Sequence, residues 1–192
     1  MIKEGIKMKE SYTLSVAGLK RELPFFKVNE NLTIAAFIIF GDVELTECCA
    51  KELLKRAPEH DIMITSEAKS IPLIYEMAKQ SGNNKYVIAR KTPKVYMKNL
   101  IKASVNSITT HGEQNLYLGE DEVVLLKGKR VLIVDDVIST GESLKALENL
   151  VEAAGGIIVG KMAVLAEGDA ILRQDIIALE KLPLFDGEGN EL

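Results

Sequence analysis

The sequence has few of the features that mark disulfide-rich, membrane-spanning or nucleic-acid-binding proteins. It has 192 residues, no tryptophan and two cysteines, Cys48 and Cys49, whose adjacency in a helical pattern argues against a disulfide between them. It contains no run of about 18 apolar residues, so we expect no membrane span. Lysine and arginine total 24 against 28 aspartates and glutamates, and the resulting net charge of −4 argues against a nucleic-acid partner.

The composition is that of an ordinary globular protein, with 47% hydrophobic and 27% charged residues. This length suits a single domain, which we expect to span residues 1–192. Residues 1–10 are charged throughout and lack the apolar centre of a signal peptide. We therefore expect a cytoplasmic location.

Apolar segments with strand and helix patterns alternate along most of the chain. Strands are expected at residues 12–16, 23–28, 32–40, 61–65, 86–89, 130–134, 157–165 and 176–179, and helices at 42–56, 71–80 and 141–154. This alternation predicts an α/β fold with a largely parallel central sheet and helices on both faces. Ligands of such sheets bind at the carboxyl ends of the strands.

Residues 92–118 have a different character. The segment is polar, includes Pro93 and Gly112, and shows no sustained period. It predicts a long loop or a β-hairpin excursion, and loops of this length within a compact domain are usually functional or mobile.

The most informative segment is residues 131–143, VLIVDDVISTGES. A buried apolar strand is expected to end in Asp135 and Asp136, followed by a turn of small residues that leads into a helix. Unpaired backbone N–H groups and the helix dipole make such a turn an anion site. Two acids beside it would repel an anion unless the ligand also presents hydroxyls or a metal, and ribose 5-phosphate meets that demand. The alternative is an ordinary strand that ends in two aspartates before a capped helix.

Two further segments carry features of anion sites. Lys69 and Ser70 lie in a polar turn directly before the helix expected at residues 71–80. Arg90, Lys91 and Lys94 follow another expected strand. Taken alone, such basic residues are more often solvated surface, but their position beside two expected phosphate sites favours a functional role.

Residues 131–143 resemble, at every position, the phosphoribosyl pyrophosphate (PRPP) signature of the type I phosphoribosyltransferases. The likeness extends over about residues 12–180. It implies a type I phosphoribosyltransferase-like fold with a small hood, formed mainly by residues 1–40. It also implies that Asp135 and Asp136 are catalytic. The residues implied to bind the 5′-phosphate of PRPP are Ser139, Thr140, Gly141, Glu142 and Ser143.

The resemblance also implies how the pyrophosphate is held. Residues 65–72 resemble the loop that binds pyrophosphate in the purine members. There, backbone N–H groups hold the pyrophosphate, often around a cis peptide. The residues implied to bind pyrophosphate are Glu67, Ala68, Lys69, Ser70, Arg90, Lys91 and Lys94. In similar proteins the corresponding basic segment sometimes reaches the active site of the neighbouring subunit. A homodimer is therefore expected here. Mg²⁺ is the implied cofactor, held mainly by PRPP, pyrophosphate and water rather than directly by side chains.

The implied acceptor is a purine base, bound near Leu19, Phe25 and Val137. Hypoxanthine-guanine enzymes usually have an acid at the position of Ser139, and xanthine enzymes have a lysine at the position of Gly168. Both departures favour adenine. Residues 103–110, however, resemble the hood loop of the xanthine enzymes and of the PRPP-sensing purine repressor, and they lack the acid-bearing loop of the adenine enzymes.

Three alternatives therefore remain open. The chain could act on xanthine or another 6-oxopurine, or on a base that is not a purine. It could also sense PRPP without turnover, although such regulators carry an additional N-terminal DNA-binding domain that we do not expect here.

Overall fold

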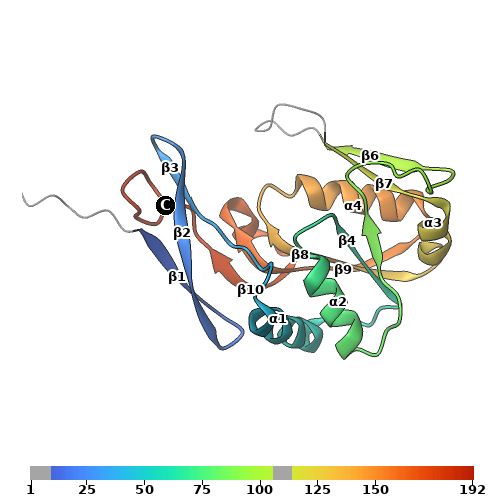
Figure 1. The fold of residues 1–192 in the computed structure, drawn as a ribbon, viewed down its shortest axis with the longest axis horizontal. Coiled ribbons are helices and arrows are strands. Elements are labelled where there is room, and N and C mark those ends of the chain that lie inside the picture. The colour runs from blue at the N-terminus through green and yellow to red at the C-terminus, as the bar shows by residue number, and fades with distance from the viewer. Residues whose placement is uncertain (1–9, 106–113) are drawn as a thin grey trace, which may run out of the picture.

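The computed structural model describes residues 10–105 and 114–192 (Figure 1). Its central element is a parallel five-stranded sheet with the order β10-β9-β8-β4-β5. The strands are β4 (Ile62–Ser66), β5 (Val87–Ala89), β8 (Arg130–Ile138), β9 (Ile157–Glu167) and β10 (Ile177–Leu182). The predicted α/β class and parallel sheet are confirmed. Among the described residues, no helix is both long and apolar enough to cross a bilayer.

Helices cover both faces of this sheet because β8 is apolar on both of its sides. Leu132 and Val134 belong to the cluster formed with α1 (Val43–Arg56) and α2 (Ile71–Gln80). Val131 and Ile133, on the other face, pack with α4 (Glu142–Ala153). The central position of β8 brings the acids that follow its apolar residues to the middle of the carboxyl edge.

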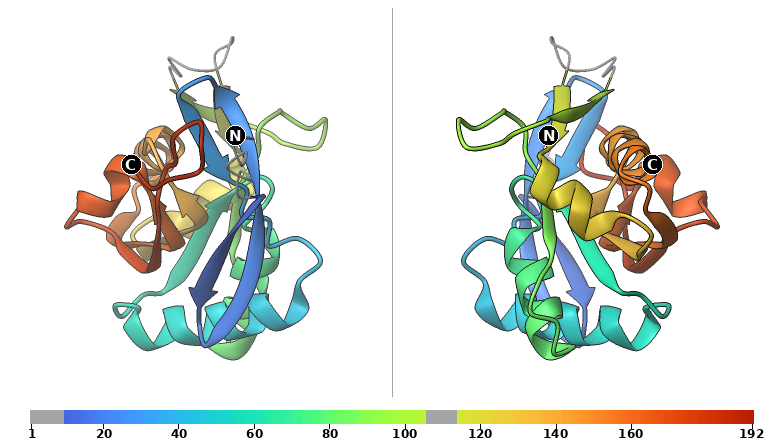
Figure 2. Two further views of the ribbon diagram at one scale, coloured as in Figure 1. Left: turned by 90° about the vertical axis from the view of Figure 1, so that its left-hand side faces the viewer. Right: turned by 90° about the vertical axis from the view of Figure 1, so that its right-hand side faces the viewer.

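A three-stranded antiparallel sheet stands at one end of the molecule and is called the hood here (Figures 1 and 2). Its strands are β1 (Ser11–Val16), β2 (Leu19–Asn29) and β3 (Leu32–Ala35). The strand predicted at residues 32–40 is therefore wrong beyond Ala35. Phe37 and Ile39 are buried, so this part of the segment is apolar because of burial and not because it pairs in a sheet.

The C-terminal segment completes the hood. Phe185 forms an antiparallel bridge with Thr33 and is only 2% exposed. Its ring centroid lies 5.2 Å from that of Tyr12 and 4.7 Å from that of Phe25. Both views in Figure 2 show this last segment, in dark red, beside the hood strands. The sequence predicted no strand or helix beyond residue 179.

The segment at residues 92–118 contains a β-hairpin, which was one of its two predicted forms. Strands β6 (Ile101–Val105) and β7 (Gln114–Leu118) pair antiparallel, and β6 packs on α4. Residues 106–113, which include most of the segment that resembles the xanthine hood loop, lie outside the described residues. The chain then forms α3 (Glu120–Leu126), which was not predicted. A short 3₁₀ helix, η1 (Gly168–Leu172), follows β9.

Candidate functional site

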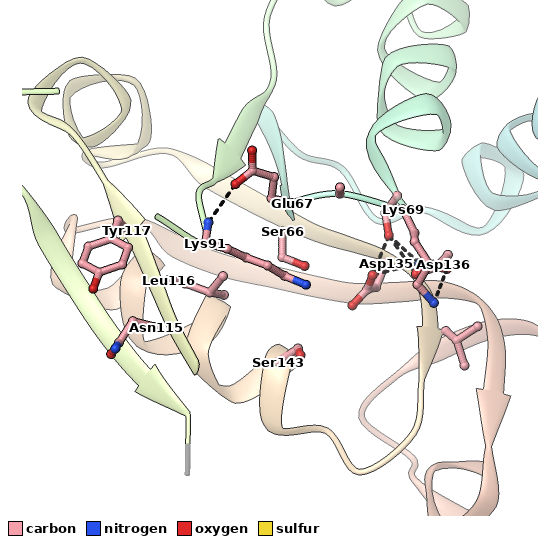
Figure 3. Close-up of a pocket in the computed structure, with 13 residues that line it drawn as sticks. Ser66, Glu67, Lys69, Lys91, Asn115, Leu116, Tyr117, Asp135, Asp136 and Ser143 are labelled. Carbon is pink, nitrogen blue, oxygen red and sulfur yellow. Dashed lines mark hydrogen bonds and ion pairs between the residues drawn. The ribbon is translucent and has the colours of Figure 1, made fainter. Parts of the chain in front are cut away.

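A hollow of about 370 Å³, called the main hollow here, lies at the carboxyl edge of the central sheet (Figure 3). Segments far apart in the sequence line it: the turn after β4, the segment after β5, strand β7, the end of β8 and the start of α4. Its lining residues are Ser66, Glu67, Ala68, Lys69, Ser70, Lys91, Asn115, Leu116, Tyr117, Asp135, Asp136, Val137 and Ser143.

Asp135 and Asp136, the acid pair, lie at the centre of this hollow and are 8% and 4% exposed. Ser70 connects them. Its hydroxyl lies 2.5 Å from Oδ1 of Asp135 and 3.0 Å from Oδ1 of Asp136. The hydroxyl oxygen of Ser70 also accepts a hydrogen bond from the backbone N–H of Asp136 at 2.8 Å. The two carboxylates at the end of β8 thus form a single buried cluster with the serine that precedes α2.

This burial changes the acid chemistry. Removal from water and the adjacent Asp136 carboxylate raise the pKa of Asp135 from 3.8 to about 7, while the Ser70 hydroxyl opposes the shift. Oδ2 of Asp136 accepts no hydrogen bond from a described residue, although Nζ of Lys69 lies 3.2 Å from it. A buried carboxylate oxygen without a hydrogen-bond partner is costly, so a ligand donor at this position would stabilise it.

The turn at residues 67–70 presents backbone donors to the hollow. The peptide bond between Glu67 and Ala68 is cis, as the resemblance implied. Within the described residues, none accepts a hydrogen bond from the N–H groups of Ala68, Lys69 or Ser70. The turn precedes α2 directly, so its donors point from the positive end of a helix dipole. Such an arrangement suits an anion, and the turn is the first candidate anion site.

Glu67 contacts the basic segment instead of facing an anion. Its carboxylate accepts the backbone N–H of Lys91 at 2.9 Å and lies 3.4 Å from Nε of Arg90. The side chain of Lys91 extends into the hollow beneath Ser66 (Figure 3). Lys94 donates to Thr92 and does not line the hollow. The structure therefore brings Lys91 to the site and leaves Lys94 outside it.

A second hollow of about 110 Å³ adjoins the first and is formed by the turn at residues 139–143. Asp135, Val137 and Ser143 line both hollows. No described residue accepts a hydrogen bond from the N–H groups of residues 140–143, and no side chain caps α4. The predicted turn is thus a second candidate anion site, which the shared lining residues connect to the first.

Gly141 makes the tight path of this turn possible. Its φ of +80° is a backbone conformation that glycine adopts without strain. A Cβ at this position would lie 2.6 Å from Nη1 of Arg173. Arg173 is oriented by a bidentate contact with Asp175, at 2.9 and 2.7 Å. The guanidinium of Arg173 therefore lies against the turn. The sequence interpretation did not include this residue.

Strand β7 contributes three lining residues that the sequence interpretation missed: Asn115, Leu116 and Tyr117. The backbone of Tyr117 exchanges two hydrogen bonds with that of Arg90, at 2.9 and 2.8 Å. The polar–apolar alternation within QNLYL was the available signal for a strand. It was overlooked because the surrounding residues read as a loop.

The three residues expected at the base lie in different places. Val137 lines both hollows. Leu19 lines a separate depression of about 490 Å³ between the hood turn, α1 and β10. The ring of Phe25 packs on that of Phe185. Of the three, the structure brings only Val137 to the acid pair.

Within the described residues, no cluster of three or more His, Cys, Asp or Glu side chains forms a cage for a metal ion. Mg²⁺ is commonly held by one or two carboxylates together with substrate phosphates and water. The acid pair lies beside the two candidate anion sites and has the donor chemistry for that arrangement.

The chain is similar to proteins of known activity. Residues 47–181 match the phosphoribosyl transferase domain family. Xanthine phosphoribosyltransferase of Brevibacillus brevis is 34% identical over 136 residues, which are 69% of this chain and 62% of that protein. The chain thus spans less than two thirds of that relative's length.

Two further relatives are named for other bases. Hypoxanthine/guanine phosphoribosyltransferase of Methanotorris igneus is 37% identical over 134 residues, covering 67% of this chain and 69% of that protein. The crystal structure of adenine phosphoribosyltransferase from Thermoanaerobacter pseudethanolicus has a TM-score of 0.64 and 27% identity, covering 74% of this chain and 84% of that one. Similarity at this level does not distinguish one purine base from another.

Proposed function

This chain belongs to the phosphoribosyltransferase family, and from that premise we propose that it transfers ribose 5-phosphate from PRPP to a purine base, with adenine favoured. The products are a nucleoside 5′-monophosphate and pyrophosphate, as in purine salvage. One observation carries the proposal: a buried acid pair lies between two turns, and no described residue accepts a hydrogen bond from the backbone N–H groups of residues 68–70 or 140–143. PRPP has the matching sequence of groups, a pyrophosphate and a 5′-phosphate separated by a ribose with two hydroxyls.

The reaction breaks the bond from ribose C1 to the pyrophosphate oxygen, forms a bond from C1 to a purine nitrogen, and releases a proton from the base. Positive charge grows on the ribose as pyrophosphate leaves. Catalysis here consists mainly of positioning and electrostatic stabilisation. The acid pair accepts hydrogen bonds from the ribose hydroxyls, directly or through water, and its negative charge favours the developing cation.

The two anion sites hold the ends of the substrate. The turn at residues 139–143 binds the 5′-phosphate, with N–H groups and the hydroxyls of Thr140 and Ser143. The turn at residues 67–70 binds pyrophosphate through its free N–H groups. Lys69 and Lys91 line the same hollow and stabilise the charge of the leaving group.

Mg²⁺ is part of the proposal as the cofactor. When bound, it neutralises pyrophosphate charge and engages ribose hydroxyls. The residues of this chain nearest to that role are Asp135 and Asp136, which hold the hydroxyls and water around the ion.

Two positions support adenine over the 6-oxopurines. A 6-oxo group requires a hydrogen-bond donor, whereas a 6-amino group requires an acceptor. Ser139 cannot supply an acid to a ring nitrogen. Gly168 has a φ of +56°, and a Cβ there would lie 3.1 Å from Cδ1 of Leu184. A lysine facing O6 is thus disfavoured at this position by backbone and by packing.

The test of this preference is kcat/KM for adenine, hypoxanthine, guanine and xanthine at saturating PRPP. We expect adenine to be preferred. A clear preference for xanthine would show that the likeness of residues 103–110 to the xanthine hood loop was the better guide. Release of pyrophosphate only with a pyrimidine would assign a different acceptor class.

We also propose that the protein acts as a homodimer. The support is indirect: Lys94 belongs to the basic segment but does not line its own chain's hollow. Twofold pairing is the commonest oligomeric arrangement.

A further inference from the structure

Ser70 lies in the turn assigned to pyrophosphate, but its side chain faces the acid pair. It is 1% exposed and occupies the N-cap position of α2, where a serine hydroxyl ordinarily accepts a backbone N–H of the first turn. Here it makes no capping hydrogen bond. Its hydroxyl instead contacts Oδ1 of both Asp135 and Asp136. Instead of the usual capping hydrogen bond within its own helix, the hydroxyl makes contacts with residues far away in the sequence.

The contacts of this hydroxyl constrain both carboxylates. A serine hydroxyl has one hydrogen to donate and two lone pairs to accept with. Ser70 accepts the N–H of Asp136 at 2.8 Å, which fixes the oxygen against the backbone of β8. The two carboxylate oxygens at 2.5 and 3.0 Å then converge on the same point. The hydroxyl therefore contacts both carboxylates at once and orients the acid pair as a unit.

We propose that Ser70 is a positioning residue, which orients Asp135 and Asp136 toward the ribose hydroxyls of PRPP and does not bind pyrophosphate through its side chain. This inference rests on the proposed function. A carboxylate whose rotamer is already set loses less freedom when it accepts a hydroxyl, so the hydroxyl of Ser70 contributes to ribose affinity. The backbone N–H of Ser70 stays available to pyrophosphate.

The experiment separates these two roles by ligand. Binding of ribose 5-phosphate, 2-deoxyribose 5-phosphate and magnesium pyrophosphate is measured by calorimetry for the wild type and for Ser70→Ala, and binding of PRPP is measured for the wild type. We expect Ser70→Ala to weaken ribose 5-phosphate about tenfold or more, which is the range for partners that orient a binding group. Pyrophosphate affinity stays within about twofold, because the backbone N–H groups are retained. The preference for ribose over 2-deoxyribose shrinks.

Two variants control for folding. Ser81→Ala removes a serine from the opposite end of α2, where Oγ donates to the carbonyl of Ala78, and it should leave all three affinities unchanged. Ser70→Thr keeps the hydroxyl, and it should restore ribose 5-phosphate binding toward the wild-type value. Circular dichroism and the melting temperature of each variant establish that a loss of affinity is not a loss of fold.

Weakened pyrophosphate binding with unchanged ribose 5-phosphate binding would overturn the proposal and make Ser70 a pyrophosphate ligand. Equal weakening of both ligands in a folded variant would also overturn it, since the turn as a whole would then be disturbed. If the wild type binds PRPP and Ser70→Ala binds every ligand equally well, this inference alone fails. If the wild type does not bind PRPP, the proposed function fails with it.

Discussion

At the scale of the residue, the decisive feature is that two neighbouring carboxylates are buried together. Such a pair is costly unless hydrogen bonds or a ligand compensate for the lost water. Ser70 and the backbone N–H of Asp136 compensate on one side. The other side faces the hollow, where Oδ2 of Asp136 has no hydrogen-bond partner among the described residues. The cost is explained if a ligand with hydroxyls completes the cluster.

Replacing one acid should therefore remove function without removing the fold. We expect Asp136→Ala to lower kcat/KM for PRPP by about a hundredfold or more, which is the size of effect seen when a preorganised electrostatic group is lost. The melting temperature should not fall, because the substitution relieves repulsion with Asp135. Asp121→Ala, which removes an exposed acid outside the hollow, is the matched control. Full activity in a folded Asp136→Ala protein would remove the acid pair from the mechanism.

The raised pKa of Asp135 predicts how stability depends on pH. Its pKa is about 7 in the folded chain against an ordinary 3.8, so between these values the native state binds the proton more tightly than the unfolded state. This contribution to stability is fully present below about pH 4 and is lost as the pH rises toward 7.

Urea unfolding of the wild type and of Asp135→Asn, each at pH 5 and at pH 8, measures this dependence. Ionisable groups away from the acid pair affect both proteins alike, so the difference reports the titration of Asp135 together with its coupling to Asp136. The wild type should lose stability relative to Asp135→Asn between pH 5 and pH 8. A difference that does not change with pH would mean that Asp135 titrates normally.

At the scale of the element, the sequence was most informative where local signals agreed with the tertiary structure. The run at residues 131–143 predicted β8, the turn and α4, because apolar residues, acids and small residues follow one another in a local pattern. The same holds for the turn before α2. These two regions supplied the acid pair and both anion sites.

Elements that depend on distant partners were missed. Helix α3 has only seven residues, with three acids in its first turn, and it is too short to show a clear period. Strand β7 lies in a polar segment for which the sequence predicted a loop or a β-hairpin without strand bounds, so Tyr117 was not recognised as a lining residue. The C-terminal segment belongs to the hood through Phe185, which contacts residues far away in the sequence. Neither the secondary-structure propensity of single residues nor the spacing of apolar residues along the chain indicates such contacts.

The role of Phe185 in the hood can be measured. We expect Phe185→Ala to lower the free energy of unfolding by about 3–5 kcal/mol, the range for removal of a buried phenylalanine. Phe26→Ala is the matched control, since Phe26 lies in β2 of the same sheet but is 55% exposed, and it should change stability by less than about 0.5 kcal/mol. Equal effects of the two substitutions in urea unfolding would show that the C-terminal segment does not stabilise the hood.

At the scale of the whole molecule, the site is assembled from segments that lie on different elements around one sheet edge. Lys91 already lines the hollow of its own chain, whereas Lys94 does not. We therefore propose that, in the proposed homodimer, Lys94 serves the partner's site. A single chain would otherwise leave it as solvated surface.

Subunit mixing tests this arrangement. Asp136→Ala and Lys94→Ala proteins should each be impaired, and a heterodimer of the two contains one site with both residues intact. We expect it to recover up to about half of the wild-type activity. Mass measurement confirms that exchange has occurred. Confirmed heterodimers without recovered activity would mean that each site is built from one chain, and a monomer at working concentration would end the dimer proposal.

The most direct test of the account follows the ribose itself. PRPP labelled in its ribose is incubated with the protein, Mg²⁺ and an equimolar mixture of adenine, hypoxanthine, guanine and xanthine, and the labelled products are separated. An Asp136→Ala preparation, purified in the same way, controls for contaminating enzymes. We expect the label to enter a purine nucleoside 5′-monophosphate, mainly that of adenine, only with the wild-type protein. Binding of PRPP with no label in any nucleotide would contradict the account and make the protein a sensor.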